Sequence, residues 1–433
     1  MGLARSQLAR RELLRLGGYA SLAALLSPSL AFASVQPGLM PNVTALVSRW
    51  VGPGKFPGIV TALGLPGQPT QFVARGSEGF LDADPVTPDS LFRIYSMTKP
   101  ITGMAAMMLI DEGKLSLNQP LADILPKFAH MQVQVTPDGS ITELRAAKAP
   151  ITIRQLMTHT SGLGYSIIQR GPIKTAYENA GLVSGQISRT PFPGLERGKA
   201  VPSLELFADR LAAMPLVYEP GTQWSYSVGL DLLGRVIEVV SGMAFDQFLT
   251  QRIFAPTGMT STWFQVPASE AKRLTTNYAA VAGTLVPIDG GADSIYLEKP
   301  AFPFGGSGLV SSPRDYDRFL EMLGGFGRIG GTRVMSEQAV RTGTGNLLPA
   351  GVAGPTIMGP LSHFGAGGRV GIGREAGIFG WAGAAGTVGM VDMARGIRSS
   401  IFVQFMPPDA LSLLPEYQRA VAADIAALGE RSL

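Results

Sequence analysis

Residues 90–110 read SLFRIYSMTKPITGMAAMMLI and carry the most informative local pattern of the chain. Ser90–Tyr95 has strand character, and the apolar run Met97–Ile110 predicts a helix. Ser96 and Lys99 stand three residues apart, so a helix that begins here places them on one face. Free N–H groups at a helix start favour negative charge, and burial disfavours the ammonium form of lysine. The pattern is typical of a serine nucleophile with a lysine base, although an N-cap serine before a surface lysine also fits these four residues.

Strand signals lie near both ends of the chain, and helical periodicity fills the part between them. Gly58–Leu63 and Gln71–Ala74 predict a strand pair, and Ile397–Phe405 alternates apolar and polar residues near the other end. Helices are predicted at Asn42–Trp50, Thr152–Met157, Leu204–Met214, Gly229–Val240, Pro313–Leu323 and Leu413–Leu428. We therefore expect an α+β fold in which both chain ends build one antiparallel sheet.

This organisation predicts two structural domains behind an N-terminal leader. Residues 34–95 and 300–433 would form the α/β sheet domain, and residues 96–299 a mainly helical domain inserted into it. Gly171–Pro202 is rich in Gly, Pro and polar residues, so we expect a long surface loop there.

Composition excludes several classes of function. The chain has 433 residues, 45% hydrophobic and 16% charged, which excludes a mostly disordered protein. The absence of cysteine removes disulfides, thiolate nucleophiles and Cys-type zinc sites. His130, His159 and His363 are far apart and show no HExxH spacing, so no metal site is expected. Most of the net charge of +4 lies in the first 33 residues, and no basic stripe follows, which argues against nucleic acid as a partner.

The first 33 residues are typical of a secretory signal peptide. A basic segment precedes the apolar stretch 16–33, which ends in Ala31-Phe32-Ala33 as a cleavage site. Arg10-Arg11 adds a twin-arginine pattern, so we expect a periplasmic or secreted protein. A membrane anchor is the alternative, but Pro28 and the short apolar run argue against it. We expect no membrane span in the mature chain.

Two further segments carry residues suited to catalysis. Residues 219–227 read EPGTQWSYS, a turn before a predicted helix that could present Tyr226 to a substrate. A nearby cation such as Lys99 would lower the pKa of the Tyr226 phenol and let it carry a proton. Residues 379–387 read FGWAGAAGT, where small residues would let a strand edge offer a backbone N–H to a carbonyl oxygen. His159, in THTSGL, is expected to organise a turn through hydrogen bonds.

The segment around Ser96, residues 219–227 and residues 379–387, in this order along the chain, resemble motifs of the serine beta-lactamase and penicillin-binding-protein-like superfamily. The resemblance is strongest to class C beta-lactamases and family VIII carboxylesterases. ITIRQLMTHTSGL at 151–163 and GGSGLVSSPRDYDRFLEML at 305–323 also look like this family's framework. The resemblance spans roughly Val43 to Phe405. It implies a beta-lactamase/transpeptidase-like fold whose site lies between the two domains, and no cofactor.

The resemblance also implies roles for particular residues. Ser96 would be the nucleophile, Lys99 its base and Tyr226 a proton relay that shares the base role. The backbone N–H groups of Ser96 and Ala384 would form the oxyanion hole. Substrate contacts would come from Trp381, Gly383, Tyr165 and Val228.

Two departures from the family pattern favour esters over beta-lactams. Trp381 stands where beta-lactamases carry a cationic residue, and tryptophan cannot pair with a penicillin carboxylate. Val228 stands where Tyr-x-Asn would supply an amide. We therefore predict a serine hydrolase that cleaves small carboxylic esters through an acyl-enzyme. A beta-lactamase, D,D-peptidase or other amide hydrolase of the same fold remains the alternative, as does a catalytically silent binding protein. No oligomeric state follows from the sequence.

Overall fold

The computed structural model describes residues 40–192, 195, 198–357, 362–408 and 411–431. The predicted signal peptide, residues 1–33, lies outside the described residues. Within the described part of the chain, no helix combines the length and apolar character that crossing a membrane requires.

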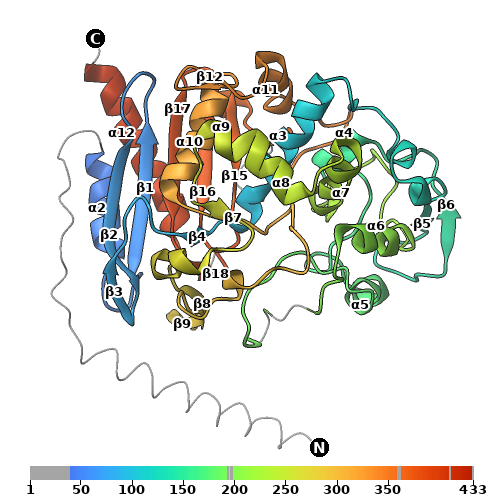
Figure 1. The fold of residues 1–433 in the computed structure, drawn as a ribbon, viewed down its shortest axis with the longest axis horizontal. Coiled ribbons are helices and arrows are strands. Elements are labelled where there is room, and N and C mark those ends of the chain that lie inside the picture. Colours follow the sequence, from blue (N-terminus) through green and yellow to red (C-terminus); the bar gives the residue numbers. More distant parts are fainter. Residues whose placement is uncertain (1–39, 193–194, 196–197, 358–361, 409–410, 432–433) are drawn as a thin grey trace, which may run out of the picture.

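The main sheet joins strands from the two ends of the chain, as expected (Figure 1). Its eight antiparallel strands run in the order β13-β14-β15-β16-β17-β1-β2-β3. Their bounds are β13 His363–Phe364, β14 Arg369–Val370, β15 Ile378–Ala382, β16 Val388–Asp392, β17 Ile397–Phe402, β1 Gly58–Gly64, β2 Gln71–Gly79 and β3 Asp82–Pro85. The two ends meet where Val60 of β1 pairs with Phe402 of β17. The α+β prediction is therefore confirmed.

Helices cover both faces of this sheet. Successive residues of a strand point to opposite faces, and Ile59 and Val60 enter different apolar clusters. On the Ile59 side, α2 (Pro41–Trp50) packs against α12 (Leu413–Arg431), and the Asp424 carboxylate accepts hydrogen bonds from the N–H groups of residues 42 and 43. On the Val60 side lies α10 (Pro313–Gly324).

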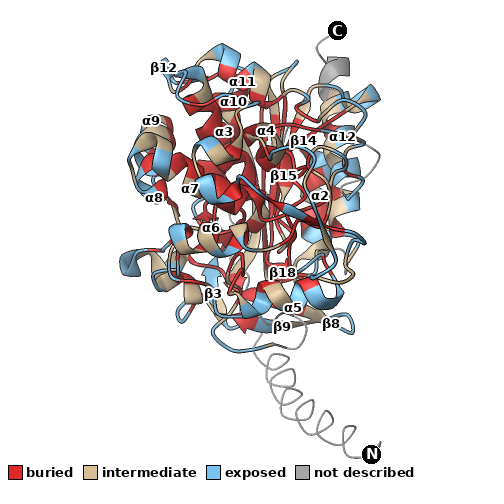
Figure 2. Cartoon of the chain, turned by 90° about the vertical axis from the view of Figure 1, so that its right-hand side faces the viewer, coloured by how far each residue is buried: buried red, intermediate tan, exposed pale blue. Residues whose placement is uncertain are grey.

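The helical part of the molecule is built around α3 (Thr98–Asp111). Residues 98–109 are all buried, so this helix is surrounded on every side (Figure 2). It contacts α7 (Gly229–Ser241), α8 (Phe245–Leu249), α11 (Glu337–Gly343) and β15. Gly103 permits a close approach, because a Cβ there would lie 2.2 Å from the Ala366 oxygen. The helix with the predicted lysine is thus fixed against the sheet.

Smaller elements complete the described chain. Two three-stranded sheets join distant segments: β4 (Phe92–Arg93), β10 (Val310–Ser311) and β7 (Thr262–Trp263) form one, and β18 (Phe405–Met406), β8 (Asn277–Val281) and β9 (Thr284–Asp289) form the other. The remaining helices and strands are α4 Ile153–Met157, α5 Gly171–Asn179, α6 Leu204–Ala212, α9 Ala255–Thr257, β5 Gln132–Gln134, β6 Leu144–Ala146, β11 Arg328–Ile329 and β12 Thr332–Arg333.

The predicted loop Gly171–Pro202 is wrong over its first part, which forms α5. Pro172 is the second residue of the helix, in the first turn, where its missing N–H costs nothing. Ile173 and Tyr177, four residues apart, bury one helical face. Two apolar residues one turn apart were enough to form a helix that the polar composition of the segment obscured. The single strand expected over Ile397–Phe405 is likewise interrupted, since β17 ends at Phe402 and β18 starts at Phe405.

Candidate active site

Ser96 lies in a tight turn between β4 and α3. Tyr95–Met97 forms one 3₁₀ turn, and Tyr95 has a φ of 41°, an uncommon conformation for a residue with a side chain. The turn is held because the phenol of Tyr316 donates to the Met97 oxygen at 3.1 Å. From Leu91 to Leu109, Ser96 is the one residue that is not buried. The strained turn therefore presents the serine hydroxyl at the end of an otherwise buried segment.

Lys99 and Tyr226 both reach this hydroxyl. The Lys99 Nζ lies 3.1 Å from Ser96 Oγ, and the Tyr226 hydroxyl lies 2.9 Å from the same atom. The lysine also donates to the Gly306 oxygen at 2.7 Å and stands 4.5 Å from the centre of the Tyr226 ring. The i, i+3 spacing on the sequence thus places the first pair as expected, and the fold adds a phenol from 130 residues away.

Burial shifts the pKa values of the two candidate proton carriers in opposite directions. It lowers the pKa of Lys99, an effect partly opposed by Tyr165 and the Asp231 carboxylate. It raises the pKa of Tyr226 to about 12, although hydrogen bonds with Ser96 and Trp381 act the other way. The expectation that a cation would lower the pKa of this phenol is therefore wrong, because desolvation dominates. The phenol is neutral at ordinary pH, and the lysine is the more readily deprotonated partner.

Trp381 holds the phenol from the opposite side. It is a buried residue of β15, and its indole N–H donates to the Tyr226 oxygen at 3.2 Å. Since the phenol oxygen accepts this bond, its own proton is free to point toward Ser96 Oγ. The sequence had indicated only that Trp381 supplies no cation, and no local pattern reveals this hydrogen bond.

The turn after β15 packs against the turn that carries Ser96. A Cβ at Gly383 would lie 2.4 Å from the Ile94 oxygen, so only glycine fits this contact. Ala384, the next residue, packs against an apolar cluster that contains Tyr95. The predicted oxyanion-hole residue therefore packs against the same apolar cluster as the residue that precedes Ser96.

Tyr165 and Val228 have contrasting positions. The ring of Tyr165 lies 5.9 Å from that of Tyr226, at the edge of the site. Val228 is completely buried, and its N–H donates to the Gly164 oxygen at 3.2 Å. The position of Val228 gives no support to a substrate contact.

His159 orders the segment that carries Tyr226. It has a φ of 57°, and its backbone oxygen accepts from the Ser225 N–H at 2.9 Å. Its Nδ1 accepts from the Ser227 N–H at 3.2 Å, so the ring proton of the neutral form belongs on Nε2. Burial lowers the pKa of this imidazole well below its usual value, which keeps it neutral. These contacts agree with the expected turn-organising role.

Asp231 is a buried residue of the site that sequence reasoning missed. Its Oδ1 accepts from the Gly306 N–H at 2.9 Å, and its Oδ2 accepts from the Ser184 hydroxyl. It thereby holds Gly306, the residue whose oxygen accepts a hydrogen bond from the Lys99 amine. An acidic residue in the first turn of the apolar helix α7 was the available signal. In the described residues, no group of three or more His, Asp or Glu side chains could hold a metal ion.

Comparison with known proteins gives one family and several relatives. The family model described as Beta-lactamase matches residues 43–423. Protein Rv1367c of Mycobacterium tuberculosis is 37% identical over 266 residues, 61% of this chain and 62% of that protein. The matched region is therefore less than two thirds of that relative. Esterase EstB of Burkholderia gladioli is 30% identical over 283 residues, 61% of this chain and 66% of EstB.

Solved structures show the same fold. EstCE1, described as a hydrolase with promiscuous acyltransferase activity, matches with a TM-score of 0.71 and 24% identity, over 88% of this chain and 97% of its own. Unliganded simvastatin synthase (LovD) from Aspergillus terreus matches with a TM-score of 0.68 and 22% identity, over 90% and 99% of the two chains. At these identities the likeness concerns the fold alone.

Proposed function

This chain belongs to the beta-lactamase family of serine hydrolases, and on that premise we propose that it cleaves carboxylic esters through an acyl-enzyme on Ser96. The observation that carries the proposal is the position of Ser96 Oγ, 3.1 Å from the amine of Lys99 and 2.9 Å from the phenol of Tyr226. A nucleophile and a base within hydrogen-bond reach, with a third group that orients them, is the arrangement of covalent hydrolases.

In the proposed mechanism, the buried Lys99 amine takes the proton of Ser96 as Oγ attacks the ester carbonyl carbon. The carbonyl oxygen becomes negative and would be stabilised by the N–H groups of Ser96 and Ala384. The bond to the alcohol oxygen then breaks, and that oxygen receives a proton from Tyr226, which Lys99 replenishes. Water attacks the acyl-enzyme by the same route in reverse and releases the acid with free Ser96.

The absence of positive charge at position 381 favours esters. Trp381 is buried and gives its N–H to Tyr226, so it offers no cation to a substrate carboxylate. The name of the EstB relative points the same way. Other relatives are named as acyltransferases, such as acyltransferase calJ of Penicillium decumbens, which is 29% identical over 348 residues. Transfer of the acyl group to an alcohol in place of water is therefore the second candidate.

The Ser96→Ala variant tests the proposal. Wild type should hydrolyse p-nitrophenyl acetate and be labelled by a fluorophosphonate probe at Ser96, and the variant should lose both. Full residual activity in the variant would contradict the assignment of the nucleophile. The same preparation should be offered nitrocefin, since efficient nitrocefin turnover with negligible ester cleavage would favour the beta-lactamase alternative. Added alcohol acceptors would reveal acyl transfer as ester product.

We also propose export through the N-terminal segment, on the basis of its basic, apolar and small-residue order. Mature protein isolated from the cell envelope should begin at Ser34. A mature N-terminus before Ser34 would contradict the predicted cleavage site.

A further inference from the structure

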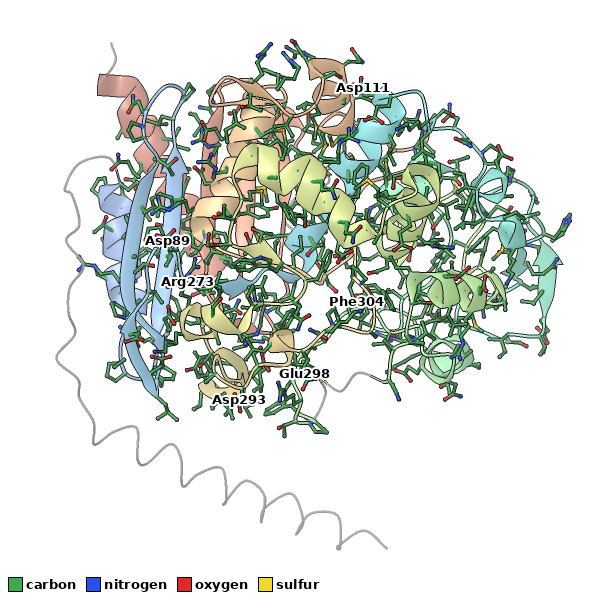
Figure 3. The ribbon with its side chains drawn as sticks, in the orientation of Figure 1. Asp89, Asp111, Arg273, Asp293, Glu298 and Phe304 are labelled. Atoms are coloured by element: carbon green, nitrogen blue, oxygen red, sulfur yellow. The ribbon has the colours of Figure 1, made fainter. Side chains whose placement is uncertain are left out.

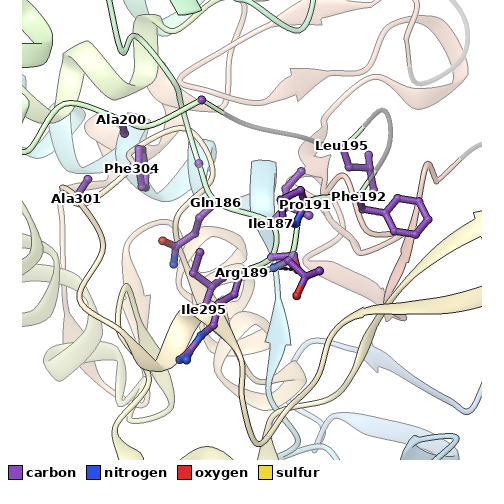
Figure 4. Close-up of a pocket in the computed structure, with 14 residues that line it drawn as sticks. Gln186, Ile187, Arg189, Pro191, Phe192, Leu195, Ala200, Ile295, Ala301 and Phe304 are labelled. Carbon is purple, nitrogen blue, oxygen red and sulfur yellow. Dashed lines mark hydrogen bonds between the residues drawn. The ribbon is translucent and has the colours of Figure 1, made fainter. Parts of the chain in front are cut away.

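A largely apolar pocket of about 310 Å³ lies between described residues from Gly185 to Ala200 and the segment 295–304. Ile187, Phe192 and Ala200 line it from the first segment, and Ile295 and Phe304 from the second (Figure 4). Small-molecule sites commonly have volumes of about 300–1,000 Å³ and mostly apolar walls. The pocket therefore has the size and lining for a modest apolar group.

One wall of the pocket continues to the residues around the nucleophile. Ile187 and Phe192 belong to, or pack against, the apolar cluster that contains Tyr95 and Ala385. Ala384 packs against the same cluster. Tyr95 immediately precedes Ser96, and Ala384 is the predicted oxyanion-hole residue. This wall therefore packs in the same apolar cluster as the residue before Ser96 and the predicted oxyanion-hole residue.

The opposite wall continues to the loop that holds Lys99. Phe304 lies nearer the centre of the view in Figure 3, and Glu298 of the same segment lies below it. Two residues after Phe304, the Gly306 oxygen accepts the Lys99 amine at 2.7 Å. Ser307 lies against Gly185 of the pocket, where an added Cβ would be 2.4 Å from its hydroxyl. That hydroxyl is buried and has no hydrogen-bond partner within the described chain.

The charges at the pocket favour a neutral ligand. Arg189 is the cationic residue of its lining, but its guanidinium donates to the Ser294 oxygen at 3.1 Å and pairs with Glu298 at 3.2 Å. Its charge is therefore already compensated, and a carboxylate would have to displace Glu298.

The residues around Tyr226 indicate which part of an ester could occupy the pocket. The leaving alcohol must lie near Tyr226, which would protonate it. The ring neighbours of Tyr226 are His159, Tyr165, Trp224 and Trp381, and none of them lines the pocket. The pocket therefore shares no lining residue with the aromatic rings around the proposed proton donor.

We propose that this pocket binds the acyl chain of the substrate, so that esters of neutral, medium-length apolar acids are preferred over acetates. The inference rests on the proposed ester hydrolysis at Ser96. Burial of one methylene group is worth about a fourfold gain in kcat/KM. The specificity constant should accordingly rise about fourfold per added methylene until the chain fills the pocket.

The test measures kcat/KM for p-nitrophenyl acetate, butyrate, hexanoate and octanoate. Ala200→Phe places a ring in the pocket from a half-buried position, so it should abolish the rise in kcat/KM from acetate to octanoate. Phe192→Ala enlarges the pocket and should move the optimum to longer chains. Ala422→Phe, on the exposed face of α12, is the matched control and should keep the wild-type profile.

Several outcomes would overturn the acyl pocket. One is a wild-type kcat/KM that does not change with acyl-chain length. Another is an Ala200→Phe variant with the circular dichroism of folded protein whose dependence on chain length equals that of wild type, or whose kcat/KM falls equally for all four esters. An effect of Ala200→Phe confined to acetates of larger alcohols would assign the pocket to the alcohol. Failure of ester hydrolysis itself is distinguishable, because wild type would then leave acetate intact and Ser96 unlabelled by the fluorophosphonate probe.

Discussion

Replacing Trp381 by Phe would show whether Tyr226 acts as a neutral phenol or as a phenolate. The change removes the indole N–H that lies 3.2 Å from the Tyr226 oxygen. A ring remains to pack against Phe364, whose centre is 5.2 Å from that of Trp381. The hydrogen bond is therefore the principal interaction lost next to the reacting groups.

The size of the loss depends on the charge of the oxygen that accepts the bond. A hydrogen bond to a neutral group is worth about 0.5–1.5 kcal/mol, which corresponds to about 2- to 13-fold in rate. A bond to a charged group is worth about 1.5–3 kcal/mol, or about 13- to 160-fold. Since burial raises the pKa of Tyr226 to about 12, we expect the neutral value. Trp381→Phe should therefore lower kcat/KM for p-nitrophenyl butyrate by about 2- to 13-fold.

Trp50→Phe provides a matched control. The Trp50 indole donates to the Glu416 carboxylate at 3.0 Å on the far side of the sheet, so this variant loses an indole hydrogen bond without touching the site. It should keep the wild-type rate. Thermal unfolding of both variants would separate lost folded protein from lost catalysis. A loss clearly above about 13-fold in folded Trp381→Phe protein would fall in the range for a charged acceptor and would refute the reasoning.

Two further predictions follow from the buried charges. Because burial lowers the pKa of Lys99, its side chain becomes a free amine at a pH below the ordinary lysine pKa of 10.5. Wild-type activity should therefore rise with pH and level off before pH 10.5. Lys99→Arg keeps a permanent cation and should lower kcat by about 10²- to 10⁴-fold at every pH from 6 to 10; recovery at high pH would contradict the base role. Arg93→Met should leave the Asp289 carboxylate buried without its partner, since the two side chains are 0% and 2% exposed. Urea unfolding should show a loss of about 3–5 kcal/mol, and an unchanged midpoint would contradict this estimate.

Local periodicity was sufficient for most of the regular structure. The predicted helix Met97–Ile110 is observed at Thr98–Asp111, and the predicted strand Gly58–Leu63 at Gly58–Gly64. The pairing of the two chain ends in one sheet could be predicted because strand patterns occur near both ends of the sequence. The helix at Gly171–Asn179 was missed because its stability comes from two buried side chains within a polar stretch.

The site was predictable to the extent that neighbours in sequence are neighbours in space. The proximity of Ser96 and Lys99 follows from helix geometry, whereas that of Tyr226 was inferred from the resemblance to a family. The bond from Asp231 to Gly306 links residues 75 positions apart, and no local pattern indicates it. The raised pKa of Tyr226 was missed for a similar reason, because desolvation depends on everything that surrounds the ring.

The neutral side chain of Trp381 influences which residue can act as the proposed base. A cation at this position would stabilise a Tyr226 phenolate and disfavour the ammonium form of the nearby Lys99. An indole N–H instead orients the phenol without adding charge. Burial then controls both groups, raising the pKa of the phenol and lowering that of the amine. In the proposed mechanism, the proton of Ser96 consequently has one suitable acceptor, Lys99, and Tyr226 is left as a donor for the departing alcohol. The same neutral residue offers no counter-ion to an anionic substrate, so the proposed base and the proposed preference for uncharged esters would have a common origin.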